Sequence, residues 1–257
     1  MKKIAYFSSV IIALIVSSSC NKALHLPTGS TPVKFTNTTY DSLATYDMLG
    51  KPSNLVMPRD SISPTLLSFL YSKLPKAADN FKAHPELFTS TANATLNFTQ
   101  KTAVSITFVQ ETALYLSTLG YYTFPTNQPP TNASQISSIK YIFPNCSALN
   151  SGGELVAGDK VNIGTFLPGT SIGFVLMENS YKPLTHSINT SGNHFCSADI
   201  LNPENDPSIR RHVVILDYPS MNPMMSLISF EDTDRSNPTN DNDFVDVTIY
   251  ATQTIVN

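Results

Sequence analysis

From about residue 93 onward, apolar residues alternate with polar ones in short runs separated by turn-forming residues. Leu96 and Phe98 alternate with polar neighbours, and Val104, Ile106 and Phe108 do so again. Because successive side chains of a strand point to opposite faces, each run predicts a strand with one buried face. Further strands are predicted at 120–124, 139–143, 160–166, 171–177, 212–218, 225–230 and 244–252. Many short strands of this kind predict a mostly β chain, folded as a β-sandwich or jelly-roll-like domain.

The composition agrees with such a fold. Proline outnumbers glycine 18 to 10, and only 14% of the residues are charged, against about 25% in a typical domain. Abundant Thr, Ser and Asn with many turns are typical of an extracellular β-rich protein. The formal net charge of −3 gives no reason to expect a nucleic acid as partner.

One helix is predicted before the strands. Ser63 is a good N-cap, Pro64 suits the first helical position, and Pro75 ends the pattern. Between them an apolar stripe at helical spacing is formed by Leu66, Leu67, Phe69, Leu70 and Leu74. We therefore expect a helix-containing N-terminal annex at residues 41–92, followed by the β-sandwich domain at 93–257.

The first twenty residues have the plan of a secretory signal peptide. A basic start at 1–3 precedes an apolar run at 4–16 and three serines at 17–19. The apolar run is too short to span about 30 Å of hydrocarbon. Cys20 directly after the serines resembles the cleavage site of bacterial lipoproteins, with an ordinary signal peptide as the alternative. We thus expect a signal peptide at 1–19, lipidation of Cys20, a tether at 20–40, and an exported protein that a lipid holds on the bacterial outer membrane.

Two further cysteines, Cys146 and Cys196, could form a disulfide in an oxidising compartment. Such a bond would close a loop of about 50 residues, for which chain entropy predicts roughly 4 kcal/mol of stabilisation. The alternative is two separate buried thiols that behave as small apolar side chains.

Six acidic residues and one arginine lie within residues 230–246, between two predicted strands. Carboxylates this close repel one another, and Ca²⁺, which binds about six to eight oxygen atoms, neutralises such a group well. Asp241 and Asp243 have the spacing of two ligands in a calcium loop, although the central Gly and closing Glu of an EF-hand are missing. Alternation along the last strand places Val245 with Val247 and Asp246 on the other face. Asp246 can therefore join the other acids only if the chain bends between 243 and 246. The alternative is a solvated loop without an ion.

The acidic segment also resembles the end of a known family. Phe-Glu-Asp at 230–232, followed by Asp-Asn-Asp-Phe-x-Asp at 241–246, is similar to the closing signature of the LruC-type domain family. The C-terminal part of that family is catalogued as domain of unknown function 4114. Further motifs follow in the family's order at 104–124, 142–145, 152–155, 158–164, 169–174 and 201–204 and at His212. The resemblance extends over about residues 50–252.

The resemblance implies a β-sandwich module of exported bacterial proteins without established enzymatic activity. It also implies a Ca²⁺ site, with candidate ligands Asp232, Asp241, Asp243 and Asp246. The family usually has Asn at the position of Val245, so a backbone carbonyl or a water would have to supply the missing oxygen.

Signs of catalysis are few, and we expect no enzyme. The chain has neither a Gly-x-Ser-x-Gly nor a His-Glu-x-x-His motif, and its histidines lack metal-ligand spacing. The main hypothesis is a non-catalytic surface lipoprotein, a calcium-stiffened β-sandwich for adhesion to, or binding of, an extracellular glycan, another ligand or a surface protein. The first alternative is a structural anchor of a surface assembly. The second is a polysaccharide hydrolase that pairs the acidic loop with Glu111, Glu154 or Glu178.

Overall fold

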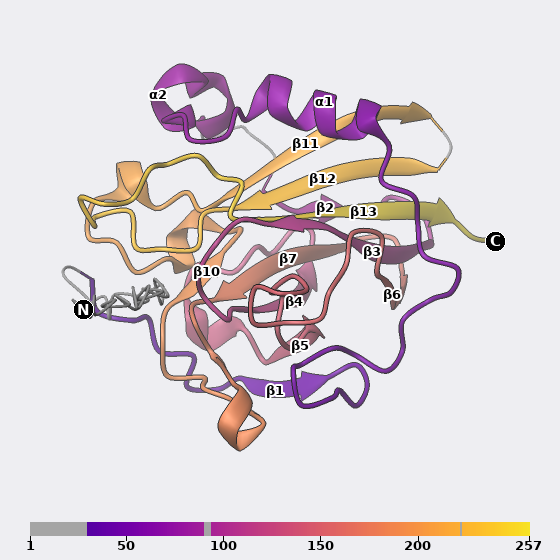
Figure 1. Ribbon diagram of the computed structural model, residues 1–257, viewed down its shortest axis with the longest axis horizontal. Coiled ribbons are helices and arrows are strands. Elements are labelled where there is room, and N and C mark those ends of the chain that lie inside the picture. The colour runs from indigo at the N-terminus through magenta and orange to yellow at the C-terminus, as the bar shows by residue number, and fades with distance from the viewer. Residues whose placement is uncertain (1–29, 90–93, 222) are drawn as a thin grey trace, which may run out of the picture.

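The computed structural model describes residues 30–89, 94–221 and 223–257. These residues form two main β-sheets, and two α-helices lie on the outer side of one of them (Figure 1). The expected mostly β fold, a β-sandwich with a short helical N-terminal annex, is confirmed. None of the helices in the described part of the chain has the length and apolar content needed to cross a membrane.

The five-stranded sheet is antiparallel throughout. Its strands are, in spatial order, β11 (Val213–Met221), β12 (Met224–Phe230), β13 (Val247–Ile255), β3 (Thr102–Glu111) and β6 (Lys160–Phe166). The predicted strands fall on these elements, but the last one begins three residues later than expected, at Val247. Residues 244–246 are therefore not part of a strand, and their side chains need not alternate between the two faces of the sheet.

The six-stranded sheet forms the other layer of the sandwich. Its path runs through β1 (Thr39–Ser42), β5 (Ser138–Phe143), β4 (Thr118–Pro125), β7 (Thr170–Met177) and β10 (His194–Cys196), and β2 (Leu96–Asn97) also pairs with β7. Only β1 is parallel to its neighbour, β5. A small hairpin of β8 (Tyr181–Lys182) and β9 (Ser187–Ile188) lies outside both sheets.

The main hydrophobic core fills the space between the two sheets. Every second residue along a strand faces the space between the sheets, where Phe108 of β3 meets Phe143 of β5 with ring centroids 6.2 Å apart. The hydroxyl of Tyr121 in β4 donates to the carbonyl of Ile163 in β6 at 3.1 Å, which also links the two sheets. Burial of both inner faces is the main stabilising term of the fold.

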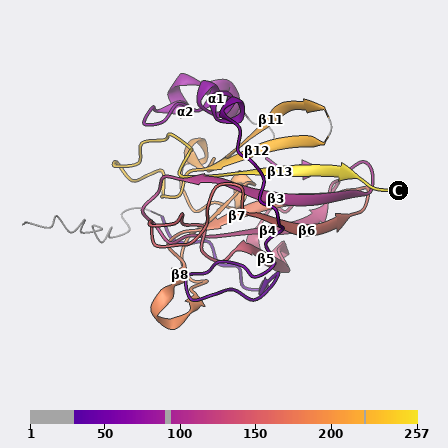
Figure 2. The same ribbon diagram turned by 45° about the vertical axis from the view of Figure 1, so that its right-hand side comes forward.

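The annex covers the outer face of the five-stranded sheet. Helix α1 (Pro64–Lys73) begins after Ser63, whose Oγ accepts a hydrogen bond from the Leu66 amide at 3.1 Å. The buried side of α1 packs on a second apolar cluster that includes Leu70, Leu74, Val214, Leu227 and Tyr250. Figures 1 and 2 show α1 and the short α2 (Asn80–Ala83) on the same side, over β11 and β12. Short 3-10 helices occur at Pro85–Phe88, Ala133–Gln135, Pro183–Thr185, Asp199–Leu201 and Pro207–Ile209.

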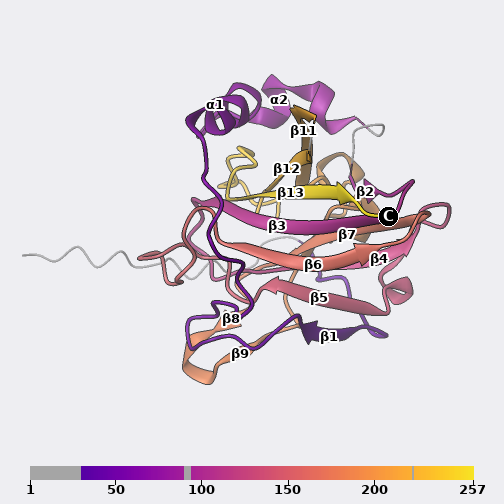
Figure 3. The ribbon, with the colours of Figure 1, turned by 90° about the vertical axis from the view of Figure 1, so that its right-hand side faces the viewer.

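Residues 30–42, called here the N-terminal strap, lie against the six-stranded sheet, and Figure 3 shows β1 at the end of the molecule opposite the helices. Phe35 stacks on His194 with ring centroids 4.6 Å apart, and the Tyr40 hydroxyl is 3.0 Å from Nε2 of the same histidine. Residues 30–40, which we expected to belong to a tether, are thus packed against the folded body. The predicted signal peptide, Cys20 and residues 20–29 lie outside the described residues and stay predictions.

The two described cysteines are free thiols rather than a disulfide. Cys146 lies in the core between the sheets, whereas Cys196 lies in the cluster on the outer face of the six-stranded sheet. Burial raises the pKa of both thiols. The pairing that the sequence left open is not formed because the six-stranded sheet lies between the two clusters.

Candidate metal centre

The acidic segment 231–246 connects β12 to β13 at one end of the sandwich (Figure 1, yellow loop on the left). Glu231 and Asp232 directly follow β12, and Asp246 directly precedes β13. These two strands are antiparallel neighbours, so the end of one lies beside the start of the other, and Phe230 is opposite Val247. The register thus brings residues 231 and 246 together although the loop between them is long.

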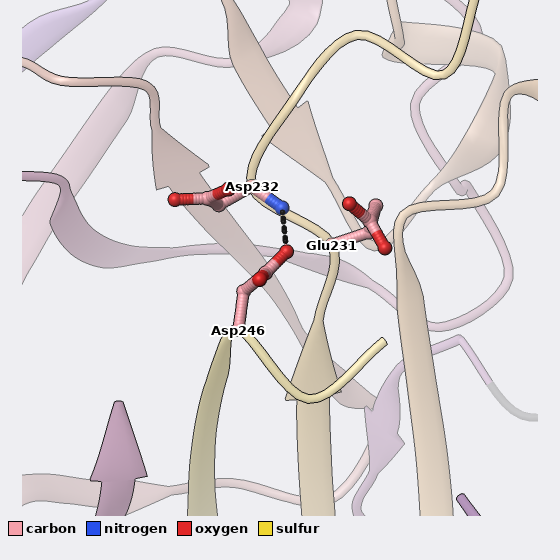
Figure 4. Close-up of side chains that lie close together, drawn as sticks. All are labelled: Glu231, Asp232 and Asp246. Atoms are coloured by element: carbon pink, nitrogen blue, oxygen red, sulfur yellow. Dashed lines mark hydrogen bonds between the residues drawn. The ribbon is translucent and has the colours of Figure 1, made fainter. Parts of the chain in front are cut away.

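Three carboxylates form the centre of the site, which we call the buried triad: Glu231, Asp232 and Asp246 (Figure 4). Glu231 and Asp232 are buried, and Asp246 is half-buried. Each offers an oxygen atom within 4.8 Å of the other two. The amide of Asp232 donates to Oδ2 of Asp246 at 2.9 Å. The side chain of Asp232 has an unsatisfied oxygen. Its Oδ2 is buried and has no hydrogen-bond partner among the described residues. A buried carboxylate oxygen without a donor is costly unless a cation or a proton faces it.

The electrostatics of the triad are unfavourable for three free carboxylates. Burial, and then the charge of Asp246, raise the pKa values of Glu231 and Asp232 well above the usual range. Glu111 at the end of β3 and Glu178 just after β7 add negative charge beside Asp232. Burial also raises the pKa of Asp246, to about 6. Like charges at low dielectric require either bound protons or a cation between them.

A second group of carboxylates shares Glu231 and adds Asp241 and Asp243. In this group the carboxylate oxygens of Asp241 and Asp243 already accept hydrogen bonds from backbone amides. Oδ1 of Asp243 accepts from the Val245 amide at 2.9 Å, and its Oδ2 accepts from the Ala77 amide at 3.1 Å. Oδ1 of Asp241, an exposed residue, accepts from the Asp243 amide at 3.2 Å. The four predicted ligands are therefore divided between two groups, and only two of them belong to the buried triad.

The chain bends between residues 243 and 246, as a shared site requires. Asn242 and Phe244 have φ angles of 56° and 57°, a left-handed conformation that is strained for a bulky residue such as phenylalanine. The expected alternation is wrong here: Val245 does not lie with Val247 between the sheets but is buried with Phe244 in the cluster beneath α1. The side chain at 245 thus faces apolar groups, which explains why valine is accepted there. Asp246 in turn contacts Asp232, which follows β12.

A chain of hydrogen bonds through His212, Glu204 and Arg235 holds the start of the loop in place. His212, next to β11, lies with Nδ1 3.0 Å from the carbonyl of Glu231 and with Nε2 2.6 Å from Oε1 of Glu204. The same Glu204 oxygen accepts from the Arg235 amide at 3.3 Å, and Nε of Arg235 donates to Oδ1 of Asn242 at 2.8 Å. Both His212 and Glu204 are fully buried. The start of the loop is therefore held by groups that do not belong to the triad, and Arg235 links it to Asn242 near the end of the loop.

A cavity of about 330 Å³ opens from the triad to the surface. Its wall is partly apolar, because Leu114, with 67% of its surface exposed, and Tyr115 stand beside the carboxylates. The complete lining consists of Thr112, Ala113, Leu114, Tyr115, Glu231, Asp232, Thr233, Thr239, Asn240, Asp241 and Asp246. Any ion at the triad would thus have one side turned toward this cavity.

Sequence reasoning did not name Glu231 as a candidate ligand, and it named Glu111 and Glu178 only as partners of the acidic loop in the hydrolase alternative. The signal for Glu231 was present, since it stands in the Phe-Glu-Asp motif beside Asp232. Strand alternation would place these two neighbours on opposite faces, and they converge only because β12 ends at Phe230. Glu111 and Glu178 come from different sheets, and no local pattern links them to the acidic loop.

The fold and the site together define a β-sandwich module with a cluster of buried carboxylates at one end. Residues 166–254, from the end of β6 through most of β13, match the family model of a domain of unknown function, DUF4114. This match confirms the resemblance of the C-terminal part, and it includes the whole buried triad. Comparisons with curated proteins and with solved structures find no match.

Proposed function

We propose that this chain is a non-catalytic module of the bacterial cell surface whose β-sandwich is stiffened by a calcium ion at the buried triad. The observation that supports it best is Oδ2 of Asp232, a buried carboxylate oxygen without a hydrogen-bond partner among the described residues, in a group of three carboxylates. Oxygen-only donors of this kind suit a hard cation, and Ca²⁺ tolerates their irregular geometry better than Mg²⁺ does.

The ion would stiffen the fold because its ligands come from two strands. Glu231 and Asp232 end β12 and Asp246 precedes β13, while Glu111 and Glu178 bring negative charge from β3 and β7. A divalent cation would turn this repulsion into attraction between the two sheets. A module held this way, exported and attached through Cys20, would serve adhesion or ligand binding outside the cell.

A specific observation also supports the hydrolase alternative. Carboxyl groups with raised pKa values beside an open cavity are typical of general acids in glycoside hydrolysis. Release of reducing sugar from a panel of polysaccharides, abolished by Glu231→Gln, would favour that activity over the non-catalytic proposal.

The cation is tested by the thermal melt of the purified protein in EGTA, in millimolar Ca²⁺ and in millimolar Mg²⁺. Calcium at about 100 times its dissociation constant adds about 2.7 kcal/mol, which raises the melting temperature by roughly 5–10 °C. Asp232→Asn should remove the shift. Asp41→Asn, which changes an exposed aspartate of β1, is the matched control and should keep it. If wild-type protein shows no shift, the proposed ion is wrong.

A further inference from the structure

The cavity beside the buried triad is lined by carboxylates on one side and by apolar side chains on another. Four carboxylates line it, three of them from the triad, and no lysine, arginine or histidine of the described residues does so. The remaining polar groups are neutral, from Thr112, Thr233, Thr239 and Asn240. Leu114 and Tyr115 supply the apolar wall. A volume of about 330 Å³ lies at the lower end of the range for small-molecule sites.

The charge balance decides which ligand can enter. One divalent cation neutralises two of the four lining carboxylates, and Glu111 and Glu178 lie close behind Asp232. The cavity therefore stays negative with the ion bound, so phosphate, sulfate and carboxylate groups would be repelled. The open positions of the ion would instead take neutral oxygen atoms, because Ca²⁺ coordinates about six to eight oxygens and the triad supplies only part of them.

From these features we propose that the cavity binds a neutral carbohydrate, with two adjacent hydroxyl groups on the ion and the sugar ring against Leu114 and Tyr115. This inference rests on the cation site proposed above and names its ligand class. Tyr115 is suited to the role because it lines the cavity beside the carboxylates and its hydroxyl is a neutral hydrogen-bond donor at physiological pH. Exposed Leu114 gives an apolar surface for the C–H face of a sugar ring.

The test uses the purified full chain on immobilised neutral polysaccharides, mannan, galactan and dextran, with dextran sulfate as the charged counterpart of dextran. We expect retention on at least one neutral polysaccharide in Ca²⁺ and release by EGTA. Leu114→Ala and Tyr115→Ala should each weaken retention up to about tenfold while the Ca²⁺ shift of the melt is unchanged. Leu184→Ala, which removes a fully exposed leucine outside the cavity lining, is the matched control and should bind as wild type does.

The possible outcomes test the carbohydrate proposal and the cation site separately. A normal Ca²⁺ shift without retention on any neutral polysaccharide overturns the carbohydrate and leaves the cation site standing. Absence of the Ca²⁺ shift overturns both. Retention that persists in EGTA, or that is stronger on dextran sulfate or on immobilised polylysine, also overturns the inference, because the ligand would then be held by other chemistry.

Discussion

Replacing Asp246 by asparagine should stabilise the calcium-free protein. The side chain keeps its shape, and the amide oxygen can still accept the hydrogen bond from the Asp232 amide that Oδ2 accepts at 2.9 Å. The substitution removes the negative charge of the Asp246 carboxyl group, whose pKa burial raises from 3.8 to about 6. Each pKa unit corresponds to about 1.4 kcal/mol, so the charged side chain costs the folded state about 3 kcal/mol at pH 7.5.

The pH dependence follows from the direction of the shift. A raised pKa means that the folded protein binds the proton more tightly than the unfolded chain does. The stability linked to Asp246 is therefore present below pH 3.8 and is lost as the pH rises through about 6. Asparagine does not titrate, so the advantage of Asp246→Asn over wild type should be only about 0.5 kcal/mol at pH 4 and about 3 kcal/mol at pH 7.5.

Urea denaturation in EGTA from pH 4 to pH 8, followed by far-UV circular dichroism, measures this difference. In millimolar Ca²⁺ at pH 7.5 the advantage of the variant should shrink to within about 0.5 kcal/mol of zero, because only wild type gains about 2.7 kcal/mol at 100 times the dissociation constant. Asp41→Asn should change stability by at most about 0.5 kcal/mol in either buffer. A variant that is no more stable than wild type at pH 7.5 in EGTA, or an advantage that does not change with pH, would refute the reasoning.

Three further predictions concern the frame around the site. Gly173→Ala should cost about 1–3 kcal/mol in urea denaturation, since its Cβ would lie 2.2 Å from Cζ of Tyr122, and an unchanged midpoint would contradict this packing. Cys146 and Cys196 should resist alkylation in the native protein and react once it is unfolded, as peptide mass spectrometry can measure, whereas a disulfide-linked peptide would contradict the free thiols. His212→Ala removes the partner of a buried glutamate and should cost about 3–5 kcal/mol; a loss below about 1 kcal/mol in the same assay would count against the buried pair.

The strands were largely predictable because alternation is a local property. The predicted segments 160–166 and 171–177 match β6 and β7 almost residue for residue, and the helix capped by Ser63 begins where its cap places it. The last strand was predicted to begin too early, at Phe244 instead of Val247. There the left-handed turn at Phe244, stabilised by its packing beneath α1, overrides the alternating pattern.

The site was predictable only in part. The sequence alone showed that acids are concentrated at 230–246 and that a bend before residue 246 would be needed to bring them together. It could not show that Asp243 also binds the annex, because the Ala77 amide that donates to its Oδ2 comes from a distant part of the chain.

By itself, then, the sequence determined the β class, the helix of the annex and the position of the acidic segment, since each depends on residues close together in the chain. The tertiary structure decided which acids form the triad. It paired β12 with β13 so that Asp246 meets Glu231 and Asp232, and it brought Glu111 and Glu178 from the two sheets to the same end. It also packed residues 30–40 onto the sandwich and separated Cys146 from Cys196. These outcomes depend on strand register and on contacts between distant segments, which no local pattern specifies.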